Sequence, residues 1–255
     1  MGNFQTVIYE KSENIAHVTL NRPQVLNSYN IQMRDELYQI LSAIRDDDEV
    51  MVVILKGAGD KAFCAGADLT EFLTAPSPVM ARQVRRERDV WGLFLSLPQP
   101  VIAALHGYVL GSGMEMALCC DLRIAAEDAR FGLPETGLGI IPAAGGTQTL
   151  PRAIGHARAL EMLLTTRQIE AKEAYDIGLV NQVVPRAELL MAAEEMARKI
   201  KRHSQKAIRL AKQAVVRGLD LPLVEGLELE RRLAALTFAG RRRRTHSGSS
   251  SKKTS

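Results

Sequence analysis

The chain has 255 residues, 46% of them hydrophobic, which is enough to bury the core of one large domain or of one domain with a small appendage. No run of 18 or more apolar residues occurs, which excludes a transmembrane helix. The net charge of +4 comes from the last 15 residues, Arg241 to Ser255, which hold six basic and no acidic residues and leave 27 basic against 29 acidic residues in a nearly neutral body.

The N-terminus and the cysteines indicate the compartment. Met1 leads within a few residues into a predicted strand, without the charged region and apolar core of a secretory signal. The three cysteines are odd in number, and Cys119 and Cys120 are adjacent, so they do not form a disulfide framework. We therefore expect a protein of the reducing cytoplasm.

The N-terminal part predicts a hairpin, a helix and a strand. Val7 to Glu10 and Ile15 to Leu20 alternate as hairpin strands do. Asn30 can cap a helix that carries a stripe of apolar residues on one face, namely Leu37, Ile40, Leu41 and Ile44. Met51 to Leu55 is a continuous apolar run of strand length.

Two segments about 50 positions apart share one pattern. Val52 to Gly57 and Ile102 to Gly107 each run from a strand into a glycine, and a turn of small residues and a helical pattern follow. This is a weak internal repeat of a strand–strand–helix unit. If the repeats stack, their helix starts lie side by side, and the backbone N–H groups near Ala67 and Ser112 can converge on one oxygen atom.

The stretch from Gly107 to Glu135 carries the strongest chemical signal. Glycines at 107, 111 and 113 lead into helix-forming residues, and a helix start presents N–H groups without helical partners, which favour anionic oxygens. Glu115 lies in that first turn, and Glu135 follows a second apolar strand and a turn. Together these groups predict a site that stabilises an oxyanion and moves protons. Taken singly, each glycine turn fits backbone geometry alone, Glu115 fits a role at the helix dipole, and Glu135 fits a surface carboxylate.

The C-terminal half predicts mostly helix. Val79 to Ser96 reads as a basic helix, and a final strand is predicted at Leu179 to Val184. From these patterns we predict three regions: a core at 1–186, a helical region at 187–239, and a disordered basic tail at 240–255.

The sequence lacks the motifs of several enzyme classes. Gly111-Ser112-Gly113 does not match the nucleophile elbow of serine hydrolases, and no Walker loop or complete dinucleotide fingerprint is present. The histidines show no metal-ligand spacing, so we expect no metal site; they are His17, His106, His156, His203 and His246.

Taken together, the motifs resemble the enoyl-CoA hydratase/isomerase (crotonase) family from residue 5 to about 235. The matching motifs are Leu20-Asn21-Arg22-Pro23 with Asn27, Ala62 to Leu69, Gly107-Tyr108, Gly111 to Ala117, Cys120 to Ala125, Phe131 to Glu135, Gly139, Pro142, Gly145 to Gln148 and Leu150-Pro151-Arg152. The resemblance implies an α/β fold, a spiral of strand–strand–helix repeats with a C-terminal helical region that builds trimers or hexamers.

The resemblance also implies the site. Glu115 and Glu135 fall on the two catalytic carboxylate positions of hydratases, as base on water and as proton donor, and the oxyanion would bind the N–H groups of Ala67 and Ser112. The residues expected to bind the acyl-CoA thioester are Val25, Leu26, Ala65, Gly66, Ala67, Asp68, Leu69, Thr70, Gly111 and Ser112. Coenzyme A enters as part of the substrate, and no permanently bound cofactor is expected. The implied reaction is addition of water to a 2-enoyl-CoA, as in fatty-acid degradation.

Two alternatives remain, and the chain departs from the family at three places, at one of which Ala143-Ala144 replaces a more common glycine-alanine turn near the acyl pocket. The first alternative is another crotonase reaction, either isomerisation or hydration of a cyclic or branched enoyl-CoA. The second is RNA binding through the tail and the arginines at 82, 85, 86 and 88, which otherwise form a solvated helix face. Ser112 stands where the family usually has glycine, and the basic tail replaces the usual charged and aromatic run that helps to hold the adenine of coenzyme A.

Overall fold

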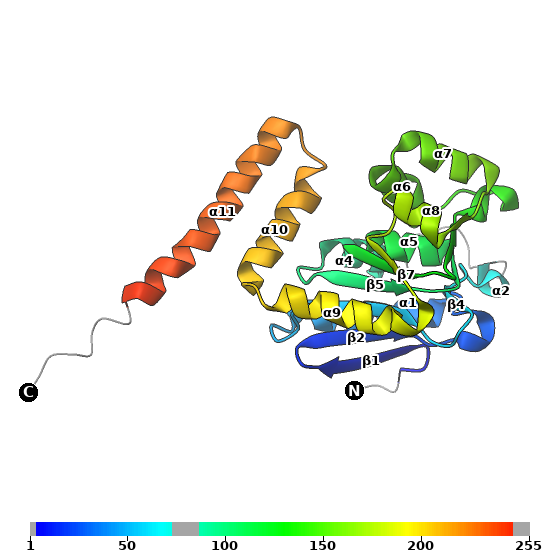
Figure 1. Ribbon diagram of the computed structural model, residues 1–255, viewed down its shortest axis with the longest axis horizontal. Helices are drawn as coiled ribbons and strands as arrows, with labels where there is room; N and C mark the ends of the chain where they lie inside the picture. Colours follow the sequence, from blue (N-terminus) through cyan, green and yellow to red (C-terminus); the bar gives the residue numbers. More distant parts are fainter. Residues whose placement is uncertain (1–3, 73–86, 247–255) are drawn as a thin grey trace, which may run out of the picture. The chain divides into compact units, whose positions relative to one another are not determined.

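The computed structural model describes residues 4–72 and 87–246, with the backbone alone for residues 239–246. The chain divides into two compact units, Met1–Lys199 and Ile200–Ser255 (Figure 1). The first unit contains two β-sheets and most of the helices, and the second is helical. Among the described residues, no helix has both the length and the apolar character that a membrane span needs.

The larger sheet has six strands in the order β1 (Val7–Ser12), β2 (Ile15–Leu20), β3 (Val52–Gly57), β5 (Val101–Leu105), β7 (Leu122–Ala126) and β10 (Gln182–Val184). β1 and β2 are antiparallel, and every later neighbour pair is parallel. β3 and β5 are almost entirely buried, which explains their unbroken apolar sequences.

The smaller sheet has four strands in the order β4 (Ala62–Cys64), β6 (Tyr108–Leu110), β8 (Arg130–Gly132) and β9 (Ile169–Glu170). The first three are parallel, and β9 is antiparallel to β8. Successive segments place one strand in the larger sheet and the next in the smaller, as β3–β4, β5–β6 and β7–β8. The helical segments that follow these pairs are α2 (Leu69–Phe72), α5 (Ser112–Cys119) and the 3₁₀ helix η2 (Pro134–Leu138). This arrangement confirms the predicted spiral of strand–strand–helix repeats.

The N-terminal elements match their prediction closely. The hairpin turn places Glu13 and Asn14 at positive φ, 48° and 64°. A short 3₁₀ helix, η1 (Pro23–Val25), leads to α1 (Ile31–Asp46), where the Asn30 side chain accepts the Met33 N–H at 2.9 Å as the predicted cap. All four residues of the predicted apolar stripe of α1 are buried.

The remaining helices of the first unit are α4 (Val90–Ser96), α6 (Gly146–Ile154), α7 (His156–Thr165), α8 (Ala171–Asp176), η3 (Arg186–Glu188) and α9 (Leu189–Lys201). The helix predicted from Val79 to Ser96 is interrupted, because Arg88 and Asp89 are not helical and α4 begins at Val90, where the Asp89 side chain accepts the Gly92 N–H at 2.9 Å as an N-cap. Residues 79–86 of that prediction lie outside the described residues. The predicted strand at 179–184 is shorter than expected, because only Gln182–Val184 pairs with β7. Leu179 and Val180 are buried, and the N–H groups of both residues donate to the carbonyl of Ala174 in α8.

The second unit is built from α10 (Gln205–Gly218) and α11 (Leu223–His246), which pack along each other (Figure 1). α9, predicted as part of the C-terminal region, lies mostly within the first unit. α11 is helical through His246, so residues 240–246 differ from the disordered tail predicted there. The rest of that tail, 247–255, lies outside the described residues.

Candidate active site

The ends of three parallel strands bring the predicted site residues together. In the smaller sheet Cys64 pairs with Val109, and Leu110 pairs with Gly132. Parallel strands have their carboxyl ends at the same edge, where α/β proteins commonly bind ligands. The residues that leave this edge are Ala65 to Asp68 after β4, Gly111 and Ser112 after β6, and Leu133 to Glu135 after β8.

Gly111 lies close both to the turn after β4 and to the side chain of Glu135. Its φ is +50°, and a Cβ atom built on it would lie 3.2 Å from Glu135 Oε1 and 3.4 Å from Gly66 Cα. Gly66 also has a positive φ, +120°. A side chain at position 111 would therefore meet both the Glu135 carboxylate and the turn after β4. The structure brings Gly66, Gly111 and Glu135 together.

Two backbone N–H groups lie next to these glycines. Ser112 is the first residue of α5, where a helix has no internal acceptor for the N–H group. Ala67 is exposed and lies between two hydrogen bonds to Tyr29: the Tyr29 N–H donates to the Gly66 carbonyl at 2.8 Å, and the Asp68 N–H donates to the Tyr29 carbonyl at 2.8 Å. The Ala67 N–H takes no part in either bond. Both predicted oxyanion donors thus follow a glycine of positive φ at the same edge.

Glu115 is held by a second loop. Its side chain is 2% exposed, and Oε1 accepts the Ala144 N–H at 2.8 Å and the Gly146 N–H at 2.9 Å. A Cβ atom on Gly146 would lie 3.1 Å from Glu115 Cγ, so the loop packs directly on the glutamate. The side chain of Glu115 is therefore oriented by backbone donors, which goes beyond the helix-dipole role considered from sequence.

Glu135 has a different environment. Among the described residues its Oε2 atom is buried and has no hydrogen-bond partner. Burial raises the pKa of Glu135 above its ordinary value, and the negative charge of Glu115 raises it further, while the backbone N–H of Glu135 opposes the shift. The two carboxylates are thus distinguished by their surroundings, one fixed by N–H donors and the other favoured in its protonated form.

The predicted acyl-CoA residues form two adjoining segments. Ala65 donates its N–H to the Leu26 carbonyl at 3.1 Å, which joins the turn after β4 to the loop after η1. Val25 and Leu69 are 39% and 53% exposed. Asp68 and Thr70 bond to each other, with Thr70 Oγ1 donating to Asp68 Oδ1 at 2.7 Å. A cavity of about 280 Å³ opens beside this loop, lined by Pro23, Gln24, Leu26, Asn27, Ala58, Asp60, Lys61 and Ala62.

Sequence reasoning missed two features of the site. The first is the pair of N–H donors at Ala144 and Gly146. The Gly145-Gly146 pair at the start of α6 was the available signal, because a turn with small residues can present its N–H groups inward. The second is the ion pair between Arg22 and Asp68, at 2.9 Å between Arg22 Nη2 and Asp68 Oδ2. Nothing in their spacing indicated this contact.

The remaining candidate groups have structural surroundings. Burial raises the pKa of the Cys64 thiol to about 11 and that of Cys119 to about 12, the latter with a further contribution from Glu115. His106 is 3% exposed, and its carbonyl accepts the Phe63 N–H at 2.8 Å. Within the described part of the chain, no three residues among His, Cys, Asp and Glu are grouped so that they could hold a metal ion.

Comparison with known proteins gives one consistent result. The sequence profile of the family described as Enoyl-CoA hydratase/isomerase matches residues 10–251. The chain is 42% identical over 230 residues to the short-chain-enoyl-CoA hydratase of Clostridium acetobutylicum, covering 88% of this chain and 86% of that protein. It is 41% identical over 237 residues to the crotonyl-CoA hydratase of Syntrophomonas wolfei, covering 92% and 91%. The crystal structure of an enoyl-CoA hydratase from Bacillus anthracis is 44% identical, with a TM-score of 0.87 and coverage of 91% and 90%.

Proposed function

Because the chain belongs to the enoyl-CoA hydratase/isomerase family, we propose that it adds water across the double bond of a short-chain 2-enoyl-CoA. The observation that carries this proposal is the pair of glutamates at one strand edge, with Glu115 fixed by two N–H groups and the pKa of Glu135 raised by burial. Two relatives of similar length are named for short-chain enoyl-CoA and crotonyl-CoA, which supports the short acyl chain.

The proposed mechanism assigns one task to each glutamate. Glu115 orients a water molecule and accepts its proton as the oxygen bonds to C3 of the enoyl chain. The electron pair of the double bond moves toward the thioester, whose oxygen becomes negative and is stabilised by the N–H groups of Ala67 and Ser112. Glu135, protonated at the start, gives its proton to C2. The products are the 3-hydroxyacyl-CoA and an enzyme whose proton must return from Glu115 to Glu135, directly or through water.

The substrate surface follows from the same geometry. The acyl-CoA would lie along residues 65–70 and the loop at Val25 and Leu26, with its thioester at the edge where Gly66 meets Gly111. The exposed side chains of Val25 and Leu69 offer apolar contacts for the pantetheine arm. Coenzyme A is part of the substrate, and we propose no permanently bound cofactor.

We further propose a homo-trimer or hexamer assembled through the second unit. α10 and α11 expose large apolar side chains that a lone helical pair does not leave in water: Val215, Leu219, Leu223, Val224, Leu227, Leu236 and Phe238. None of the three cysteines forms a disulfide, which supports a cytoplasmic location for this assembly.

The test is a panel of 2-enoyl-CoA esters of increasing chain length, including branched and cyclic members, with products identified by mass spectrometry. We expect the fastest turnover with four-carbon crotonyl-CoA and a product heavier than the substrate by one water. A product of unchanged mass with a displaced double bond would identify an isomerase instead. A panel without any turnover would contradict the proposal.

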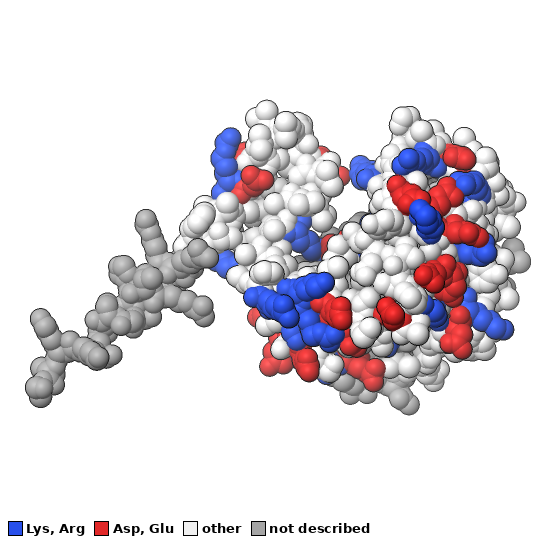
Figure 2. All heavy atoms as spheres, in the orientation of Figure 1, with Lys and Arg blue, Asp and Glu red and all other residues white. Residues whose placement is uncertain are grey.

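Nucleic-acid binding finds little support in the described residues. Arg88 forms an ion pair with Asp35, and Arg82, Arg85 and Arg86 lie outside the described residues. Figure 2 shows one contiguous group of lysine and arginine side chains in the lower middle of the view, bordered by acidic side chains, and basic side chains beside acidic ones over the right of the view. The acidic side chains around the basic group reduce its attraction for a phosphate backbone.

A further inference from the structure

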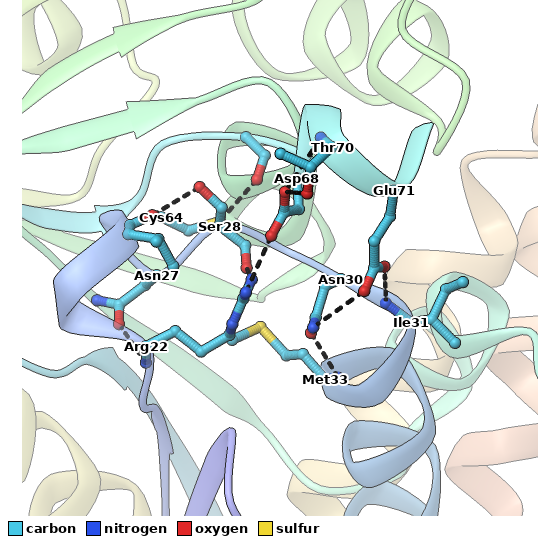
Figure 3. A network of polar contacts seen from close by, with 12 residues as sticks. Arg22, Asn27, Ser28, Asn30, Ile31, Met33, Cys64, Asp68, Thr70 and Glu71 are labelled. Atoms are coloured by element: carbon cyan, nitrogen blue, oxygen red, sulfur yellow. Dashed lines mark hydrogen bonds and ion pairs between the residues drawn. The ribbon is translucent and has the colours of Figure 1, made fainter. Parts of the chain in front are cut away.

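The loop after β2 is joined to the turn after β4 along most of its length. Three backbone hydrogen bonds connect them: Ala65 N–H to Leu26 O at 3.1 Å, Tyr29 N–H to Gly66 O at 2.8 Å, and Asp68 N–H to Tyr29 O at 2.8 Å. Figure 3 shows the two segments facing each other, with Arg22 reaching across from the start of the loop toward Ser28 and Asp68. Arg22 is thus the side chain that spans the junction.

The guanidinium of Arg22 makes two contacts. Nη1 donates to the Ser28 carbonyl at 2.6 Å, and Nη2 forms the ion pair with Asp68 at 2.9 Å. The two side chains of the pair are only 16% and 13% exposed. The Thr70 N–H and hydroxyl both donate to Asp68 Oδ1, so the side chains of Arg22 and Asp68 are both held in place.

The backbone of Arg22 is fixed as well. Asn27 is fully buried, and its Oδ1 accepts the Arg22 N–H at 2.9 Å. Its Nδ2 donates to the carbonyls of Ala58 and Ala62 at 2.9 and 2.8 Å. Through Asn27, the backbone of Arg22 is therefore connected to the loop after β3 and to the first residue of β4.

The contacts of Arg22 lead to the oxyanion donor in two steps. The carbonyl of Ser28 and the N–H of Tyr29 belong to one peptide group, and the carbonyl of Gly66 and the N–H of Ala67 belong to another. Both peptides are trans, so in each the C=O and N–H point in opposite directions. Arg22 bonds to the first carbonyl, the Tyr29 N–H bonds to the second, and the Ala67 N–H forms the far end of this row.

We propose that Arg22 is a positioning residue for the oxyanion hole, acting on the Ala67 N–H through two consecutive peptide groups. Its bond to Ser28 sets the plane of the first peptide, and that peptide sets the plane of the second. The hydrogen bond from Arg22 also polarises both peptides in the same sense, because hydrogen bonds in a row strengthen one another, and this strengthens the last donor where negative charge develops. Asp68 keeps the guanidinium in place. Glycine restricts its own backbone angles little, so at Gly66 this row of hydrogen bonds helps to fix the orientation of the Gly66–Ala67 peptide.

This inference rests on the proposed function, and its test has two readouts. The first is turnover of crotonyl-CoA, split into kcat and KM. The second is the infrared carbonyl stretch of [1-¹³C]butanoyl-CoA bound to the enzyme; this saturated thioester does not react, and its stretch falls as hydrogen bonds to the carbonyl strengthen. The variants are Arg22→Gln, which removes the charge, and Asp68→Asn, which leaves the guanidinium. Arg34→Gln is the matched control, because Arg34 is 17% exposed and pairs with Asp35 at 2.8 Å.

For Arg22→Gln we expect kcat to fall by about tenfold or more, KM to change less than about threefold, and the carbonyl stretch to move toward its value in water. Asp68→Asn should show a smaller change of the same kind, and Arg34→Gln none. If Arg22→Gln fails to fold, Arg22→Lys replaces it. Lysine keeps the charge but has one nitrogen in place of the planar guanidinium, whose two nitrogens reach Ser28 and Asp68 separately, so a smaller effect in the same direction is expected.

Three results would overturn the inference. A folded Arg22 variant with wild-type kcat and carbonyl stretch would show that Arg22 does not act on Ala67. An equal effect of Arg34→Gln would show that any lost ion pair suffices. Wild-type protein that neither hydrates crotonyl-CoA nor shifts the butanoyl-CoA carbonyl would overturn the proposed function together with this inference, whereas normal wild-type hydration with unaffected Arg22 variants would overturn the inference alone.

Discussion

At the scale of single residues, the site separates two glutamates by their hydrogen bonds. Glu115 accepts two backbone N–H groups, and Glu135 keeps a buried oxygen that has no partner among the described residues. Like charges held close together push their pKa values apart, so one proton shared between them suffices for an acid and a base. The asymmetry supports Glu115 as the base and Glu135 as the acid.

We expect Glu115→Gln and Glu135→Gln each to lower kcat by about 100-fold or more, because an amide keeps the shape of the side chain but does not exchange the proton. Acyl-CoA binding and thermal stability should stay near wild type. Steady-state kinetics with calorimetric titration of butanoyl-CoA would measure both, with the exposed Glu127→Gln as control. Wild-type turnover in either variant would remove that glutamate from the acid–base pair.

Ser112 tests the oxyanion hole from its other side. If its backbone N–H is the donor, Ser112→Gly should change kcat by less than about tenfold, equivalent to about 1.4 kcal/mol. Ser112→Pro removes the donor and should raise the barrier by about 3 kcal/mol, provided that the variant still binds butanoyl-CoA. A loss of a hundredfold or more in Ser112→Gly would instead assign the hydroxyl a direct role.

At the scale of elements, α1 is tied to β1 by a buried carboxylate. Glu36 is 7% exposed and accepts the N–H groups of Gln5, Thr6 and Val7 and the hydroxyl of Thr6, at 2.7 to 3.2 Å. Burial acts to raise the pKa of Glu36, but the hydrogen bonds from Gln5 and Thr6 outweigh it, and the net pKa is lowered. The ionised form therefore stabilises the fold.

For Glu36→Ala we expect a loss of about 3 kcal/mol in the free energy of unfolding at pH 7, because buried donors lose their acceptor.

Because the pKa of Glu36 is lower in the folded than in the unfolded protein, the stability that its carboxylate contributes depends on pH. The contribution is complete above the unfolded pKa of about 4.3 and is lost as the pH falls through the folded pKa. Urea unfolding at pH 7 and pH 3.5 should therefore show a smaller difference between wild type and Glu36→Gln at the acid pH. The exposed Glu49→Gln is the control, and a difference independent of pH would contradict the assignment.

The elements also show what the sequence could predict. Long or strongly patterned segments were predicted correctly, such as the hairpin, α1 with its Asn30 cap, and the buried runs of β3 and β5. The strands β4, β6 and β8 have three residues each, too few to show a period of two, so the sequence pattern predicts turns in these regions. The pairing of Arg22 with Asp68 and of Glu115 with Ala144 and Gly146 joins distant parts of the chain, so local sequence does not show it.

At the scale of the whole molecule, the second unit is the proposed site of assembly. Leu223 and Val224, at the start of α11, are 76% and 79% exposed, and Leu219 nearby is 73% exposed. Burying such side chains gains about 1.5–3 kcal/mol each relative to leaving them in water. Burial of these exposed apolar side chains therefore favours association of monomers through this unit.

We expect light scattering at micromolar protein to give three or six times the chain mass of 28.0 kDa. The double variant Leu219→Asp/Val224→Asp should shift the mass toward the monomer, because burying the added carboxylates would cost several kcal/mol. Ile8→Asp, at a 41% exposed position on β1, is the control. A monomer mass for the wild type would contradict the proposed assembly.

The chemical groups of the site come from three successive repeats: Gly66 follows β4, Gly111 follows β6 and Glu135 follows β8. These strands bond to one another across repeats, so no single repeat holds a working fragment of the site. Pairing between distant segments is slow during folding compared with the formation of helices. Recovery of turnover during refolding therefore reports when the whole fold is complete. After dilution from urea, helical circular dichroism should recover first and catalysis only after a lag, and a chain that regains both together would show that its repeats assemble as fast as its helices form.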